Sequence, residues 1–174
     1  VLQEYAEFLM GQNCVQQGID VAEKLRQHYT QDEKMLTKYK AELLLWLADL
    51  YSDHEVREYK KARHCISEVL EIIPLLYNDM EREGLTALAK AKGAIRQRRI
   101  GNVKEAEQWS REALELSAGL AEQNPQDGTL RWILGESMQN SANQMKRMGQ
   151  MREAERIARK SVEIFEDLTG NYPS

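Results

Sequence analysis

Residues 101–125 read GNVKEAEQWSREALELSAGLAEQNP, and residues 149–173 read GQMREAERIARKSVEIFEDLTGNYP. When the two opening glycines are aligned, Ala106 falls on Ala154 and both stretches end in proline. The positions that agree are mostly small or apolar, and these are the positions at which packing constrains the choice of residue. The chain therefore contains an internal repeat, with an offset of 48 residues between the two copies.

The same pattern continues toward the N-terminus. Ala62 lies 44 residues before Ala106, and the segment LEI at 70–72 then matches LEL at 114–116. A fainter copy, a further 40 residues upstream, aligns Ala22 with Ala62. We therefore predict a single domain of four repeats, which span residues 1–31, 32–74, 78–125 and 127–173.

Each repeat is predicted to contain two helices. Small and apolar residues recur every three or four positions, and the two-residue alternation of a strand is absent. Pairs of cations precede Gly101 and Gly149, which is typical of helix ends, because cations favour the C-terminus and glycine accepts the left-handed cap. Asp127 or Thr129 is expected to cap the next helix. The predicted helices span 1–16, 18–30, 33–53, 56–73, 78–99, 103–123, 129–147 and 151–169.

With these motifs the chain resembles the tetratricopeptide repeat family. In that family a small residue opens the turn, an alanine comes early in the second helix, and a second small residue precedes an aliphatic–Glu–aliphatic run. The third repeat has Gly101, Ala106, Ala113 and LEL in these places. The resemblance implies an all-α fold, a right-handed superhelix (α-solenoid) of about four antiparallel helix pairs. Spacings of 40, 44 and 48 residues exceed the usual family period of about 34 and indicate a long-repeat, bacterial-type variant.

The composition is that of a globular chain. Its 174 residues are 42% hydrophobic and 30% charged, with a formal net charge of −4, which argues against a general nucleic-acid binder. The longest apolar run, LLLWLA at 43–48, is too short to cross a bilayer. Two cysteines without metal-binding spacing predict a reducing, cytoplasmic location. Because the first residue is Val1, we expect the chain to be a fragment of a larger protein.

The sequence contains no motif that indicates catalysis. Phosphate-binding glycine loops, the dinucleotide fingerprint, HExxH and G-x-S-x-G are all absent from it. His64 and Cys65 are adjacent on a predicted helix, so their side chains diverge and cannot share a metal. Cys65 aligns with Trp109 of the third repeat and is expected to lie in the core. We therefore expect no enzymatic activity, no cofactor and no metal.

Binding residues are inferred from the family resemblance. In tetratricopeptide repeats the first helix of each pair lines the inner groove, where partner peptides usually bind. Transferring the groove positions to this chain gives an acidic second repeat and a basic third and fourth repeat. The residues expected to contact a partner are Asp49, Lys92, Arg96, Arg99, Gln139, Asn140, Asn143 and Arg147.

The charge of this groove predicts the kind of partner. Residues 90–99 carry five cations and no acid. Helix C-termini favour cations, which explains Arg98 and Arg99 but not Lys90 or Lys92. Cationic side chains pair with carboxylates, and asparagine can bond the N–H and C=O of an extended backbone. The partner is therefore expected to be an acidic or extended peptide. The clamp that some relatives use for a C-terminal carboxylate is not reproduced in register.

The leading interpretation is a non-catalytic protein–protein or peptide interaction module, which serves as a scaffold or sensor segment of a larger regulatory or signalling protein. The alternative is a receptor for a small signalling peptide, in which Asn140 and Asn143 contact the peptide backbone. A helical-repeat nucleic-acid binder is less favoured, because the groove lacks aromatic residues for base stacking. An exposed last repeat also predicts a homodimer through the terminal helices.

Overall fold

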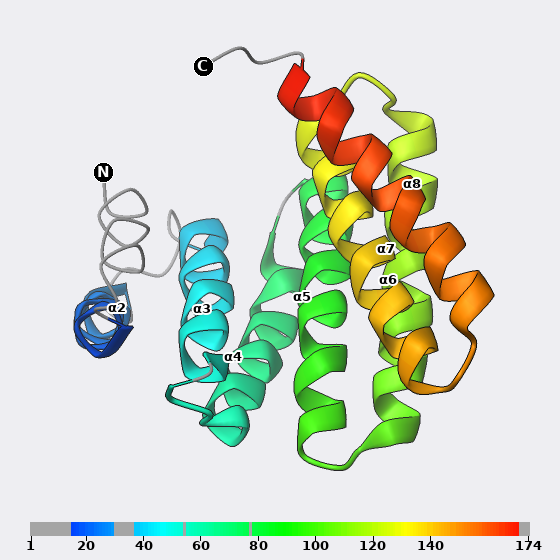
Figure 1. Ribbon diagram of the computed structural model, residues 1–174. Helices are drawn as coiled ribbons and strands as arrows, with labels where there is room; N and C mark the ends of the chain where they lie inside the picture. The colour runs from blue at the N-terminus through cyan, green and yellow to red at the C-terminus, as the bar shows by residue number, and fades with distance from the viewer. Residues whose placement is uncertain (1–14, 30–36, 54, 77, 171–174) are drawn as a thin grey trace. The chain divides into compact units, whose positions relative to one another are not determined.

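The computed structural model describes residues 15–29, 37–53, 55–76 and 78–170, and every regular element in these ranges is a helix (Figure 1). The all-α class predicted from the sequence is confirmed. None of the described helices is long and apolar enough to cross a membrane. The elements are α2 (Val15–Tyr29), α3 (Thr37–Ser52), α4 (Tyr59–Ile72), the 3₁₀ turn η1 (Ile73–Leu75), α5 (Asp79–Arg99), α6 (Val103–Gln123), α7 (Gly128–Arg147) and α8 (Met151–Gly170).

The chain groups by contacts into two compact units, Val1–Leu76 and Tyr77–Ser174, which we call the N-terminal unit and the C-terminal unit. The division falls between the second and third predicted repeats, and each unit has a core of its own. The sequence predicts one continuous superhelix over all four repeats, and that arrangement stays a prediction.

In the N-terminal unit, α3 packs between α2 and α4. Its core is built from large apolar side chains, such as those of Leu44, Leu47 and Ile66, which are fully buried. The sequence places a helix break at residue 17, but residues 15–29 form one helix, and the helix predicted over 1–16 lies almost entirely outside the described residues. The fourth predicted helix ends at Pro74 as expected, because η1 takes over where proline removes a backbone donor.

The C-terminal unit consists of two helical hairpins. α5 and α6 form the first, α7 and α8 form the second, and α7 packs against both helices of the first hairpin. The hairpins therefore stack through α7, and their shared core contains Ala87, Leu120, Leu130 and Ile133. Gly84 of α5 lies at this contact, where an added Cβ would meet Leu130 Cδ2 at 3.4 Å, an ordinary van der Waals distance.

The turns inside the hairpins explain why their helices end where the sequence predicts. Gly101 and Gly149 have φ of 94° and 80°, a left-handed backbone that glycine adopts without strain. The N–H of Asn102 donates to the carbonyl of Gln97 at 2.8 Å, which satisfies one of the last carbonyls of α5. Arg57 aligns with Gly101 at the repeat offset and also has a positive φ, of 52°. In both units a residue with positive φ therefore comes just before the second helix of a hairpin, although the connection is longer in the N-terminal unit, where α3 ends at Ser52 and α4 begins at Tyr59.

The repeat alignment is also visible in burial. Ala62, Ala106 and Ala154 occupy the same place in successive second helices and are 0%, 0% and 7% exposed. Seven residues later, Val69, Ala113 and Ser161 are equally buried. The hydroxyl of Ser161 donates to the carbonyl of Gly135 on α7 at 2.8 Å, so even this polar member serves helix packing. The close-packed positions inferred from the sequence are confirmed for α4, α6 and α8.

The interior of the C-terminal unit is unusually polar. Its fully buried positions are occupied by alanine, serine and amide side chains, whereas those of the N-terminal unit hold alanine, larger aliphatic side chains and one cysteine. Small residues let helix axes approach closely, and buried polar groups then need partners on neighbouring helices. The buried polar residues of the described chain are Arg96, Gln97, Ser110, Ser117, Ser137, Asn140, Ser141, Gln144 and Ser161.

Candidate functional site

The residues predicted to bind a partner lie in both units. Asp49 is half-buried on α3 of the N-terminal unit. The other seven lie on α5 and α7 of the C-terminal unit, two helices that pack against each other. The candidate site is therefore the exposed surface formed by α5 and α7, which we call the α5–α7 surface.

The basic run on α5 is partly used inside the fold. The Nζ of Lys90 lies 2.5 Å from Glu112 Oε2 on α6, and this hydrogen bond holds the pKa of the Glu112 carboxyl below its usual value. Arg98 donates to the side chain of Gln144 on α7 and lies 3.5 Å from Glu107 of α6. Two of the five cations thus bind neighbouring helices.

Two further predicted residues are buried. Arg96 is 4% exposed, and its Nη1 donates to the carbonyl of Lys92 at 2.7 Å. Asn140, on α7, is 7% exposed. These two side chains therefore offer little surface to a partner. Of the remaining predicted residues in the C-terminal unit, Lys92 is half-buried, and the exposed ones are Arg99, Gln139, Asn143 and Arg147.

Three of the exposed residues form a row on α7. Gln139, Asn143 and Arg147 follow one another at intervals of four residues, so their side chains point to the same side of the helix. Within the described part of the chain, the structure gives none of the three an intramolecular hydrogen bond or ion pair. The row therefore presents two amides and one guanidinium to the surroundings.

A buried amide fixes α7 against α5. Gln144 is 4% exposed, its Nε2 lies 3.4 Å from the carbonyl oxygen of Ala94, and its Oε1 accepts a hydrogen bond from Arg98. Gln144 is not among the residues predicted from the sequence. A signal was present, because the 48-residue offset pairs Gln144 with Arg96, and both positions hold long polar side chains. Gln144 positions the row on α7 relative to α5.

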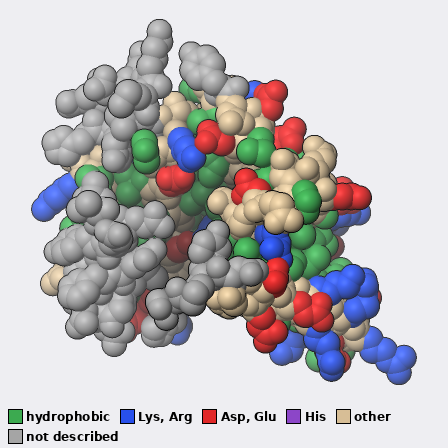
Figure 2. Space-filling model, turned by 90° about the horizontal axis from the view of Figure 1, so that it is seen from above, with side chains coloured by type: hydrophobic (Ala, Val, Ile, Leu, Met, Phe, Trp, Pro, Cys, Tyr) green, Lys and Arg blue, Asp and Glu red, His purple; other side chains and the backbone are tan. Residues whose placement is uncertain are grey.

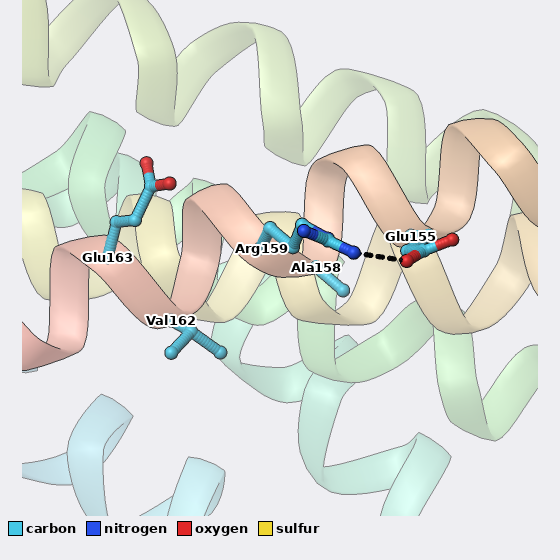
Figure 3. A pocket seen from close by; sticks show the side chains of 5 residues that line it. All are labelled: Glu155, Ala158, Arg159, Val162 and Glu163. Carbon is cyan, nitrogen blue, oxygen red and sulfur yellow. Dashed lines mark hydrogen bonds and ion pairs between the residues drawn. The ribbon is translucent and has the colours of Figure 1, made fainter.

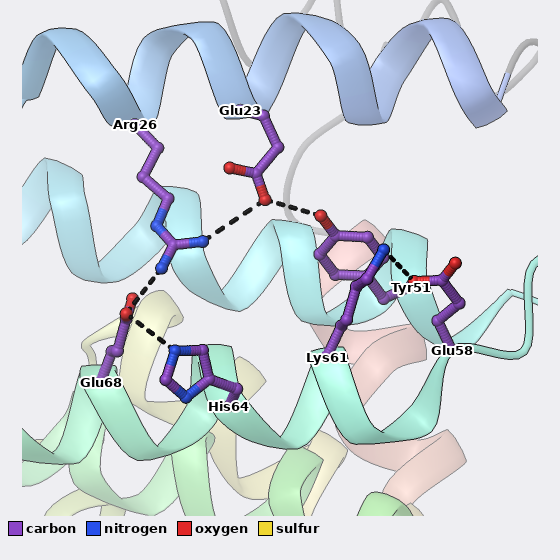
Figure 4. A network of polar contacts seen from close by, with 7 residues as sticks. All are labelled: Glu23, Arg26, Tyr51, Glu58, Lys61, His64 and Glu68. Carbon is purple, nitrogen blue, oxygen red and sulfur yellow. Dashed lines mark hydrogen bonds and ion pairs between the residues drawn. The ribbon is translucent and has the colours of Figure 1, made fainter.

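The N-terminal unit holds a network of polar contacts that the sequence did not reveal (Figure 4). Arg26 of α2 lies 2.6 Å from Glu68 Oε1 of α4 and 3.3 Å from Glu23. The hydroxyl of Tyr51 on α3 donates to Glu23 at 2.6 Å. Burial, together with this hydrogen bond, raises the pKa of Tyr51 well above its usual value. The network joins the three helices α2, α3 and α4.

Charged side chains of both signs are mixed on the exposed surface of the described residues. Figure 2 shows Lys and Arg side chains next to Asp and Glu side chains on the face that it presents, with hydrophobic side chains between them. A shallow, open hollow lies on α8 and is lined by Glu155, Ala158, Arg159, Val162 and Glu163 (Figure 3). All five residues come from one helix, so this hollow does not enclose a ligand.

Comparison of the sequence with protein-family models found no match, and comparison with curated proteins found none either. The likeness to tetratricopeptide repeats therefore stays a prediction, which depends on the repeated sequence pattern.

Proposed function

We propose that this chain is a non-catalytic interaction module of the tetratricopeptide type, a scaffold or sensor segment of a larger regulatory protein. We further propose that its α5–α7 surface binds an extended, acidic peptide. The repeated turns and the repeated buried alanines of successive second helices support the first part. The row of Gln139, Asn143 and Arg147 supports the second and is the observation on which the proposal depends.

The spacing of this row suits an extended peptide. Residues four apart on a helix are separated by about 6 Å along its axis. Residues two apart in an extended chain are separated by about 6.6 Å along it. Successive side chains of the row can therefore meet successive peptide residues that point the same way. The two amides each offer donors and an acceptor to the peptide backbone, and Arg147 can pair with a carboxylate.

Cations alone would not justify this proposal. Arg99 and Arg147 are the last residues of α5 and α7, where a positive charge stabilises its own helix through the helix dipole. Gln139 and Asn143 gain nothing from that effect, and asparagine is a weaker helix former than alanine or glutamate. An exposed pair of amides on the same side of α7 is therefore better explained by a bound partner.

A phage-displayed library of random peptides of about 12 residues tests the proposal. We expect selection on this chain to enrich peptides that contain Asp or Glu and whose apolar residues do not recur at the three- and four-residue intervals of a helix. A triple variant, Gln139→Ala, Asn143→Ala and Arg147→Ala, should lose at least about tenfold in affinity for the selected peptides, because each lost hydrogen bond contributes roughly 1 kcal/mol.

A matched control removes one guanidinium and two amide side chains elsewhere. Arg111, Gln123 and Gln126 are exposed on α6 and in the turn that follows it. Replacing these three by alanine should leave peptide affinity unchanged. If no peptide is enriched, or if the α7 triple variant binds as well as the wild type, the proposed site is wrong.

A further inference from the structure

The repeat alignment shows that the second hairpin of the C-terminal unit has a face without a neighbour. α7 packs against α6, whereas no other helix among the described residues of this unit packs against α8 in that way. Ala121 of α6 is 9% exposed, and its equivalent Thr169 on α8 is exposed. Leu114 is half-buried, and its equivalent Val162 is 52% exposed.

This outer face of α8 has an apolar flank and a charged flank. Met151, Ala158 and Val162 fall on the apolar flank, and Met151 is 55% exposed. In Figure 3, Ala158 and Val162 lie along one edge of the helix and Glu163 along the opposite edge, with Glu155 and Arg159 between them. A surface of this kind resembles one side of a helix–helix interface.

Four exposed charges on this face, Arg152, Glu155, Arg159 and Glu163, alternate in sign along the chain. Arg156 lies at the edge of the face and pairs with Glu153 of its own helix at 2.5 Å, and Glu166 lies C-terminal to the four. Within a single chain, Arg159 pairs with Glu155 on the same helix at 2.6 Å, and their side chains are 75% and 64% exposed. Reversing the direction of the helix turns the order plus–minus–plus–minus into minus–plus–minus–plus. The pattern is therefore complementary to an antiparallel copy of itself.

We propose that α8 docks against α8 of a second copy of this chain, antiparallel and about a two-fold axis near residue 157. In that register Arg152 meets Glu163 of the second copy, and Glu155 meets its Arg159. The apolar flanks also meet, because a two-fold axis in the interface brings like flanks together, so Met151 contacts Val162 of the second copy and Ala158 lies near the axis. Both polar and apolar parts of the face are matched in a single register.

The expected dimer is weak. α8 is about 30 Å long, and only its first two thirds take part. A single helix pair buries less than the roughly 800 Å² per partner of a standard stable interface. We therefore expect a dissociation constant of about 10 to 500 µM. The row on α7 lies outside this interface, so a test of the dimer does not decide whether the proposed peptide site exists.

Sedimentation equilibrium from about 5 to about 500 µM tests the dimer, with charge reversal to test its register. An acidic variant carries Arg152→Glu with Arg159→Glu, and a basic variant carries Glu155→Arg with Glu163→Arg. We expect each variant alone to be monomeric, because like charges then face each other, and an equimolar mixture to form a heterodimer. The double variant Lys104→Glu with Arg111→Glu, on the exposed face of α6, should dimerise like the wild type.

A cross-link gives a measurement that does not depend on charge. In a Cys14→Ser background, Ala158→Cys should form a disulfide-linked dimer on mild oxidation, because two α-carbons near the axis come within disulfide range. Ala118→Cys, on an exposed position of α6, should not. A wild type that stays monomeric over the whole range, a variant that dimerises alone, or a mixture that fails to associate would each overturn the proposal.

Discussion

Replacing Gly101 by alanine should destabilise the C-terminal unit, whereas the same substitution at Gly119 should stabilise it. At both positions an added Cβ would meet no atom of the described chain within 4 Å, so packing does not decide the outcome. The backbone does. Gly101 has φ of 94°, whereas Gly119 lies inside α6 and has no positive φ.

The magnitudes follow from these two conformations. A left-handed backbone costs alanine roughly 1–2 kcal/mol. Alanine also restricts the unfolded chain, which returns about 0.4–1 kcal/mol, so Gly101→Ala should lower the free energy of unfolding by about 1 kcal/mol. At Gly119 the backbone is already helical, and alanine should raise the free energy of unfolding by about 1 kcal/mol. Gly149 has φ of 80° and should behave like Gly101.

Urea unfolding followed by tryptophan fluorescence measures the difference. Trp109 and Trp132 lie in the C-terminal unit and Trp46 in the N-terminal unit, so a Trp46→Phe background reports on the C-terminal unit alone. We expect the urea midpoints of Gly101→Ala and Gly119→Ala to move by roughly 0.3–1 M in opposite directions, which is a change of about 1 kcal/mol divided by a slope of about 1–3 kcal/mol per molar urea. Changes of the same sign would refute the left-handed turn at Gly101 and with it the alignment of the hairpins.

Two further predictions concern buried positions. Ala106→Leu should lower the free energy of unfolding by about 1–3 kcal/mol in the same assay, because Ala106 is fully buried. Ala118→Leu, on the exposed side of α6, should leave the free energy of unfolding nearly unchanged. Equal effects of the two substitutions would contradict the close packing at Ala106. Burial raises the pKa of the Cys65 thiol to about 11, so the folded state favours the neutral thiol. The burial of this neutral thiol stabilises the fold at any pH below the usual thiol pKa, and that stabilisation is lost as the pH rises toward 11. The wild type should therefore lose more unfolding free energy between about pH 8 and pH 11 than Cys65→Ala does, and parallel pH profiles of the two would count against the burial of this thiol.

The helices could be predicted from the sequence because their ends carry local signals. α6 spans the predicted residues, and α5, α7 and α8 differ from prediction by one residue at one end. Asp127 caps α7 by accepting hydrogen bonds from the N–H groups of Thr129 and Leu130 at 2.9 and 3.0 Å, one of the two caps considered. Where no glycine marks the turn the prediction was poorer, since α4 begins at Tyr59 after the positive φ of Arg57 rather than at residue 56.

The site was harder to predict, because a repeat alignment gives the position of a residue along a helix but not what its side chain meets. Arg96 and Asn140 were expected to face a groove, yet both are buried, in a unit whose interior holds polar side chains. Lys90 pairs with Glu112 across the hairpin, a contact between residues that no local pattern links. Cys65 was expected in the core and is 1% exposed, because its place in the repeat is shared with apolar residues.

The side-chain amide signals of Gln139 and Asn143 in NMR spectra test the central claim most directly. Titration with a peptide selected from the phage-displayed library should shift both signals together, at the same peptide concentration that shifts the backbone signals along α7. The signals of Gln123 and Gln126 should stay in place. Amide signals of Gln139 and Asn143 that do not move when the peptide saturates the chain would show that the peptide binds elsewhere, and would contradict the account.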